Sequence, residues 1–85
     1  MNKIFVDVAW EDYIYWQTTD KKILKKINEL LKDIERNGNE GLGKPESLKH
    51  ELEGFWSRRI TLEHRLIYQV VGENINILQC RGHYE

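Results

Sequence analysis

The residues of this chain that could cut an RNA backbone gather in its second half. Glu46 offers a carboxylate base, and His83 offers an imidazole, which can give up a proton near neutral pH. Arg65, Arg59 and Lys49 are cations that could hold a phosphate group while negative charge develops on it. These residue types match what metal-independent cleavage requires when a 2′-hydroxyl attacks the adjacent phosphate.

Tyr84 follows His83 directly, and its ring could stack on a splayed base or its phenol could donate a further hydrogen bond. Arginine is favoured where a planar anion such as phosphate is held by two donors. Each candidate also has an ordinary structural explanation. Glu46 would suit a solvated loop, His83 a frayed end, and the arginines surface ion pairs. Residue types alone therefore leave both explanations open.

The sequence contains no pattern typical of a metal or cofactor site. Its Cys and His residues lack zinc-ligand spacing, and neither a glycine-rich phosphate loop nor a Ser/His/Asp pattern occurs. We therefore expect no metal and no cofactor. The single cysteine, Cys80, excludes an intrachain disulfide and suits a reducing cytosol. No apolar run is long enough for a signal peptide or a membrane span, so we expect a cytoplasmic location without membrane contact.

Length and charge limit how the chain could bind nucleic acid. Its 85 residues predict one small domain over residues 1–85. Thirteen Lys and Arg face 14 Asp and Glu, for a net charge of −1, so no bulk positive field attracts RNA. A phosphate site must therefore come from the placement of a few arginines.

The first half of the chain predicts a helical hairpin that supports a sheet. Residues 3–6 are typical of a short strand, Asp7 is expected to cap a helix over residues 8–17, and Asp20 to cap a second helix. Gly38 is expected to end the second helix with positive φ. The second helix has one apolar stripe, formed by Ile23, Leu24, Ile27, Leu30, Leu31 and Ile34. Off this stripe lies a basic face that could be solvated or could contact RNA, formed by Lys21, Lys22, Lys25 and Lys26.

The second half predicts the sheet. Residues 37–45 form a connecting loop, and residues 46–52 could be a short strand or a helical turn. Residues 55–61, 65–71 and 75–81 are typical of three antiparallel strands, the last of them central because it is apolar on both faces. Alternation puts Arg59 and Arg65 on the open face and Arg58 toward the helices, where it needs a helix carboxylate. The expected fold is α+β, an antiparallel sheet packed against an N-terminal two-helix hairpin in the order β-α-α-β-β-β.

Ordered blocks of residues across nearly the whole chain resemble one known family. The blocks are Trp10-Glu11-Asp12-Tyr13, Gly43-Lys44-Pro45-Glu46, Gly54-Phe55-Trp56-Ser57-Arg58-Arg59-Ile60, Glu63-His64-Arg65-Leu66, and Cys80-Arg81 with His83-Tyr84. They resemble the Txe/YoeB family of bacterial toxins, within the RelE-like toxin superfamily. One departure is Glu85, because the chain often stops at the preceding tyrosine.

The resemblance implies a ribosome-dependent mRNA endonuclease that needs no metal and is neutralised by a partner antitoxin. It assigns catalysis to Glu46 (general base), His83 (general acid), Arg65 (transition-state clamp) and Tyr84, and RNA binding to Lys49 and Arg59. The expected partners are the cognate antitoxin, the ribosome and mRNA, with a homodimer left open. Two alternatives are a gyrase-poisoning relative of the same fold and a non-catalytic antitoxin-binding module.

Overall fold

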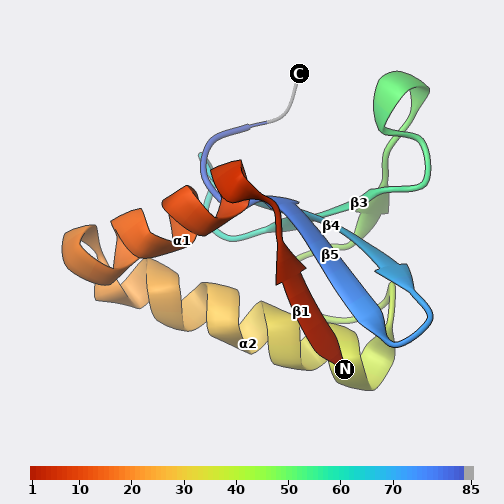
Figure 1. The fold of residues 1–85 in the computed structure, drawn as a ribbon, viewed down its shortest axis with the longest axis horizontal. Helices are drawn as coiled ribbons and strands as arrows, with labels where there is room; N and C mark the ends of the chain where they lie inside the picture. The colour runs from red at the N-terminus through yellow and green to blue at the C-terminus, as the bar shows by residue number, and fades with distance from the viewer. Residues whose placement is uncertain (84–85) are drawn as a thin grey trace.

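The computed structural model describes residues 1–83, which form two α-helices, a short 3₁₀ turn and a five-stranded sheet (Figure 1). Along the chain the elements are β1 (Asn2–Phe5), α1 (Asp7–Thr19), α2 (Lys21–Asn37), β2 (Glu46–Ser47), η1 (His50–Leu52), β3 (Trp56–Arg59), β4 (Arg65–Val71) and β5 (Asn74–Gln79). The helices pair as a hairpin on one side of the sheet (Figure 1). The α+β architecture expected from the sequence is confirmed.

The sheet is mixed. Its strand order is β1-β5-β4-β3-β2, and the pairs from β2 to β5 are antiparallel, whereas β1 runs parallel to β5. Short connections force β3, β4 and β5 to alternate in direction. No short turn links β1 to β5, so the direction of β1 is free of that constraint. The central position expected for β5 is confirmed, since β1 and β4 flank it.

The caps of the two helices differ from each other. The expectation that Asp7 caps α1 is wrong, because Val6 occupies the N-cap position without a side-chain hydrogen bond and Asp7 is the first helical residue. A carboxylate in the first turn still favours the helix through the macrodipole. The Asp20 carboxylate accepts hydrogen bonds from the backbone N–H groups of Lys22 (3.0 Å) and Ile23 (3.3 Å), which confirms its cap on α2. Gly38 ends α2 with φ of 63°.

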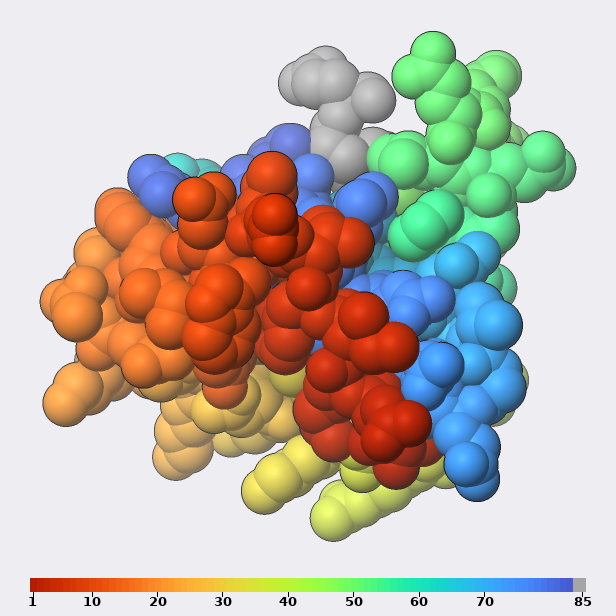
Figure 2. All heavy atoms as spheres, in the orientation of Figure 1, coloured from red at the N-terminus to blue at the C-terminus, as the bar shows by residue number. Residues whose placement is uncertain are grey.

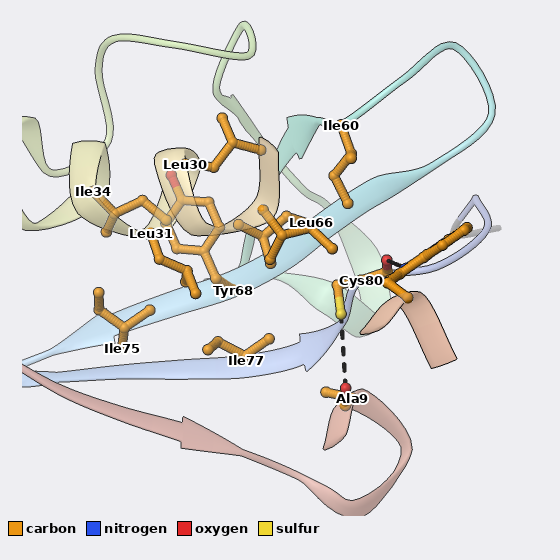
Figure 3. Close-up of a cluster of buried hydrophobic side chains, with 12 residues drawn as sticks. Ala9, Leu30, Leu31, Ile34, Ile60, Leu66, Tyr68, Ile75, Ile77 and Cys80 are labelled. Carbon is orange, nitrogen blue, oxygen red and sulfur yellow. Dashed lines mark hydrogen bonds between the residues drawn. The ribbon is translucent and has the colours of Figure 1, made fainter. Parts of the chain in front are cut away.

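The core lies between the helices and the sheet, and Figure 3 shows its buried side chains. The stripe on α2 contributes four fully packed residues, Ile27, Leu30, Leu31 and Ile34. Across from it β4 and β5 contribute Leu66, Tyr68, Ile75 and Ile77. The predicted periodicity of α2 is therefore confirmed. The helices cover one face of the sheet, and the opposite face is open.

Residues 46–52 form both structures that the sequence left open. Glu46 and Ser47 make the edge strand β2, and His50–Leu52 make the 3₁₀ turn η1. In Figure 2 the segment around η1, coloured green, stands out from the rest of the surface. This projection borders the open face of the sheet.

Candidate active site

The predicted alternation along β3 is confirmed. Arg58 has no exposed surface and points into the protein, whereas Arg59, the next residue, is exposed. Arg59 pairs directly with Arg65 across β3 and β4. Paired residues of an antiparallel sheet share a face, so the two guanidinium groups emerge from the same side.

A groove of about 520 Å³ opens on that side of the sheet. It is lined by Lys44, Pro45, Glu46, Ser57, Arg59, Arg65 and His83. The structure thus brings together four of the residues singled out in the sequence: Glu46, Arg59, Arg65 and His83. Lys49 lines a larger adjoining groove of about 870 Å³, which shares Glu46 and His83 with the first. Tyr84, the remaining candidate, lies outside the described residues.

Glu46 is held at the groove by backbone contacts on both sides. It pairs with Ser57 of β3, and just before it the Gly43 carbonyl accepts a hydrogen bond from the Arg59 N–H (2.7 Å). Lys44 and His50 bracket the segment with φ of 52° and 58°. Residues other than glycine seldom adopt this left-handed conformation, and such strain clusters at functional sites. The backbone at Glu46 is therefore constrained from both ends.

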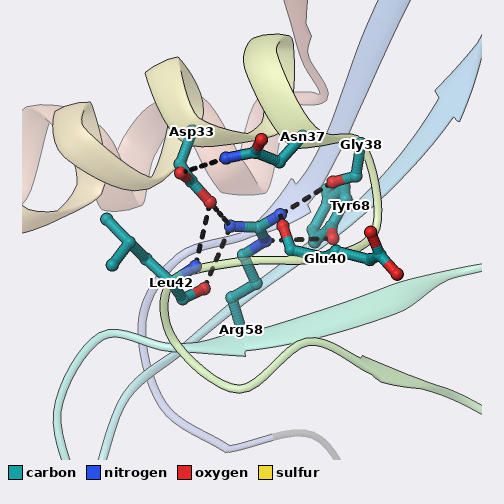
Figure 4. A network of polar contacts seen from close by, with 7 residues as sticks. All are labelled: Asp33, Asn37, Gly38, Glu40, Leu42, Arg58 and Tyr68. Carbon is teal, nitrogen blue, oxygen red and sulfur yellow. Dashed lines mark hydrogen bonds and ion pairs between the residues drawn. The ribbon is translucent and has the colours of Figure 1, made fainter.

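Arg58 secures the loop that leads to this segment (Figure 4). Its Nε donates to the Tyr68 hydroxyl (3.1 Å), and its Nη1 donates to Asp33 Oδ2 (2.5 Å) and to the Leu42 carbonyl (3.0 Å). Its Nη2 donates to the carbonyls of Gly38 and Glu40, both at 2.7 Å. Five donated bonds match the five N–H groups of a guanidinium. The helix carboxylate expected for Arg58 is Asp33, and hydrogen bonding from Arg58 lowers the pKa of that carboxyl group.

Arg65 and His83 meet at the loop between β3 and β4. Arg65 Nη1 donates to the carbonyl oxygens of Thr61 (2.7 Å), Leu62 (3.2 Å) and His64 (3.1 Å). His83 Nε2 lies 3.0 Å from the same Leu62 carbonyl. A carbonyl oxygen can only accept, so Nε2 carries a proton in this geometry. One backbone carbonyl thus joins the two candidate catalytic side chains.

Sequence reasoning missed the contacts that hold the segment leading to His83. Trp16 Nε1 donates to the Cys80 carbonyl (2.9 Å), and Asp12 accepts from the Cys80 N–H (3.1 Å). The Arg81 guanidinium stacks over the Tyr15 ring, 3.6 Å from its centre. All three contributing side chains belong to α1. These contacts could not be predicted from the sequence, because they join residues at least 64 positions apart and leave no local pattern.

Cys80 is structural. Burial raises the pKa of its thiol to about 12, with the Asp12 carboxylate adding to the shift. Its Sγ lies 3.7 Å from the Ala9 carbonyl in the core (Figure 3). A buried neutral thiol is a poor nucleophile, so the candidate chemistry belongs to the groove.

Within residues 1–83, no three His, Cys, Asp or Glu side chains come together in a way that could hold a metal ion. Neither helix of this described part has the length and apolar character needed to cross a membrane.

The helical hairpin packed on a mixed sheet is a RelE-like toxin fold: it matches a chain of the toxin-antitoxin complex RelBE2 from Mycobacterium tuberculosis with a TM-score of 0.68 and 25% identity, covering 96% of each chain. The sequence model described as "YoeB-like toxin of bacterial type II toxin-antitoxin system" matches residues 5–84, and the chain belongs to this family. Both the resemblance and the fold expected from it are confirmed.

Close relatives cover the chain almost completely. It is 60% identical to Toxin YoeB of Escherichia coli (strain K12) over 84 residues, which are 99% of this chain and 100% of that protein. The structure of a YoeB dimer from Staphylococcus aureus matches with a TM-score of 0.94 and 56% identity, covering 99% of this chain and 98% of that one. A YoeB-YefM complex from Staphylococcus aureus matches with a TM-score of 0.93 and 55% identity, at the same coverage.

Proposed function

We propose that this toxin is a ribosome-dependent, metal-independent mRNA endonuclease that acts in the cytoplasm as one domain over residues 1–85. The observation that supports it is the groove in which Glu46, Arg59, Arg65 and His83 meet. A base, an acid and two cations are what cleavage by the neighbouring 2′-hydroxyl requires.

In the proposed reaction Glu46 takes the proton from the 2′-hydroxyl as the 2′-oxygen attacks the phosphorus. The bond from phosphorus to the 5′-oxygen breaks, and His83 gives that oxygen a proton. The products are a 2′,3′-cyclic phosphate and a free 5′-hydroxyl. Since Nε2 of His83 keeps its proton on the Leu62 carbonyl, we assign the transferred proton to Nδ1 of the imidazolium form. The transfer leaves a neutral imidazole with its proton on Nε2. Arg65 clamps the developing charge and Arg59 binds the same phosphate.

Two further groups complete the proposed RNA site. Lys49, in the adjoining groove, would bind a neighbouring phosphate of the message. Tyr84 would stack on a base or donate a hydrogen bond beside His83. These roles follow from the residue types and from the family resemblance.

The ribosome is proposed to supply what the free toxin lacks. Affinity for a long RNA strand needs a surplus of cations, and this chain has 13 Lys and Arg against 14 Asp and Glu. The decoding site holds the message taut and would supply the geometry of attack, and positioning of this kind can account for several kcal/mol of a reaction barrier. The basic face of α2 would then contact ribosomal RNA through Lys21, Lys22, Lys25 and Lys26.

The proposed protein partner is an antitoxin, since a Staphylococcus aureus relative is found in a complex with YefM. We expect its tail to cover the region of Arg59, Arg65 and His83, as a disordered segment that folds on binding can do. A second copy of the toxin is a further proposed partner, because another Staphylococcus aureus structure is a YoeB dimer.

The test compares one message, naked and on programmed ribosomes, at equal toxin and salt. We expect cleavage on ribosomes only, and we expect Glu46→Ala and His83→Ala each to slow it by about 10²–10⁴-fold. Glu73→Ala is the control, because it removes an exposed carboxylate from the turn between β4 and β5.

Each other outcome has a distinct meaning. Equal cleavage of naked message would reject the ribosome requirement and leave the residue roles standing. Wild-type rates in His83→Ala would reject the acid assignment. An intact message with wild-type toxin would favour the non-catalytic module, and trapped gyrase-DNA breaks would favour the gyrase poison.

A further inference from the structure

The backbone just before His83 is anchored at Gly82 by two hydrogen bonds. The Gly82 N–H donates to Nδ1 of His64 (2.8 Å), and the Gly82 carbonyl accepts from the Arg65 N–H (3.0 Å). Gly82 has φ of 80°, a conformation natural to glycine, and a side chain added there would meet no atom within 4 Å. These two bonds are the anchors nearest to His83 on the backbone, and they add to the contacts of Cys80 and Arg81 with α1.

His64 is held so that Nδ1 faces Gly82. Its ring lies edge-on to Trp16, with the ring centres 4.8 Å apart and the planes at 73°. An N–H group can only donate, so Nδ1 must be the unprotonated nitrogen of this imidazole. Trp16 also holds the Cys80 carbonyl, so one aromatic side chain supports both the His64 ring and the strand end.

The loop that carries His64 also contacts both candidate catalytic side chains. The Leu62 carbonyl accepts from Arg65 Nη1 and lies 3.0 Å from His83 Nε2. The His64 carbonyl accepts from the backbone N–H groups of Ile60 (2.9 Å) and Thr61 (3.3 Å), which closes the loop on itself. His64 thus links a closed loop to the C-terminal segment at the point where Arg65 and His83 meet.

We propose that His64 is a positioning residue for His83, acting through the hydrogen bond from Gly82 to Nδ1. The proposal rests on the proposed function, in which His83 donates a proton to the leaving oxygen. Without the acceptor, Gly82 keeps only the bond from the Arg65 N–H. The backbone between the anchored Cys80 and His83 then loses a restraint, and the imidazole of His83 shifts from the line of proton transfer. A shift of about 1 Å in a reacting group can cost on the order of 10²-fold in rate.

Three substitutions distinguish the effect of the Nδ1 acceptor from the effect of the ring that packs on Trp16. His64→Phe keeps an aromatic ring against Trp16 and removes the acceptor. His64→Asn places its Oδ1 one bond from Cγ, where Nδ1 stands, and removes the ring. His64→Gln carries its amide one bond further out, at the position of Nε2. If His64 acts through Nδ1, the variant that keeps the acceptor, His64→Asn, should keep the cleavage activity. If it acts through packing, the variant that keeps the ring, His64→Phe, should keep it.

The assay is single-turnover cleavage of message on programmed ribosomes with excess toxin, alongside thermal unfolding. We expect His64→Phe and His64→Gln to slow cleavage by about 10–100-fold, and His64→Asn to stay within about threefold of wild type. The melting temperature should fall least in His64→Phe. Activity that ranks the variants in the order of their melting temperatures would overturn the proposal.

A second comparison uses the His83→Ala background. Residues that act through one another are non-additive, so adding His64→Phe there should slow the residual cleavage by less than about twofold. If His64→Phe slowed cleavage in the His83→Ala background by about the same 10–100-fold as in the wild-type toxin, the proposal would be overturned, because His64 would then act independently of His83. A wild-type toxin that leaves the message intact overturns the proposed function and this inference together. An active wild type with an equally active His64→Phe protein overturns only the inference.

Discussion

Arg58 and Arg59 are consecutive residues of β3 with identical side chains in opposite situations. Arg58 has no exposed surface, and all five of its N–H groups are used by Asp33, Tyr68 and loop carbonyls. Arg59 is exposed and lines the groove with Arg65. The first arginine holds the fold, and the second faces the position proposed for RNA.

The difference shows how burial decides what an arginine can do. A buried guanidinium has lost its hydration, so each donor must find a partner inside the protein. Once all donors are used, none remains for a phosphate. An arginine on the open face stays hydrated until an anion replaces the water, which suits a binding role. The strand period of two is sufficient to assign these neighbours to different roles.

The largest effect should come from Arg58→Ala. Removing one partner from a buried polar network costs about 3–5 kcal/mol, which is comparable to the whole stability of a small domain. We therefore expect a mostly unfolded protein, measured by urea denaturation followed by circular dichroism. Arg59→Ala is the matched control and should change stability by less than about 0.5 kcal/mol. Equal losses in the two variants would remove the distinction between the two arginines.

Next in size is the effect of Arg65→Ala on cleavage. Removing one preorganised donor from a developing charge costs about 10²–10³-fold in rate. Arg65→Lys should recover only part of this loss, because an ammonium group cannot reproduce the guanidinium fork. The measurement is the cleavage rate on programmed ribosomes. Circular dichroism should show a folded protein in both variants, and an unfolded Arg65→Ala protein would mean that Arg65 resembles Arg58.

The smallest effect concerns Asp33, which completes the Arg58 network. Hydrogen bonding from Arg58 lowers the pKa of Asp33, with further bonds from Leu42 and Asn37 acting in the same direction. A lowered pKa in the folded state stabilises the protein above the unfolded pKa of about 3.9, and this contribution is lost as the pH falls through the folded pKa. Asp33→Asn should therefore be less stable than wild type at pH 7.

The gap between the two urea midpoints should begin to shrink as the pH falls below the unfolded pKa of about 3.9. It should close only below the lowered folded pKa of Asp33, where the carboxylate is protonated in the folded protein as well. The measurement is a series of urea titrations of both proteins across this range. A gap that stays constant with pH would mean that the Asp33 charge contributes nothing through Arg58.

The sequence by itself determined the features that repeat along the chain. The apolar stripe of α2 follows from a period of 3.6 residues, and the opposite faces of Arg58 and Arg59 follow from a period of two. The cap at Asp20 depends only on its own side chain and on N–H groups two and three residues later. The candidates Glu46, Arg59, Arg65 and His83 could be chosen by residue type and by family resemblance, without any distance between them.

Only the tertiary structure decided which distant residues meet. The bond from Gly82 to His64 spans 18 residues, and the bond from Trp16 to Cys80 spans 64. The parallel pairing of β1 with β5 and the location of Lys49 in the adjoining groove could not be read from the sequence either. Periodicity reports which side of an element a residue faces, but it carries no information on what packs there. That partner depends on the whole path of the chain, because contacts distant in sequence form only when the packed core brings their elements together.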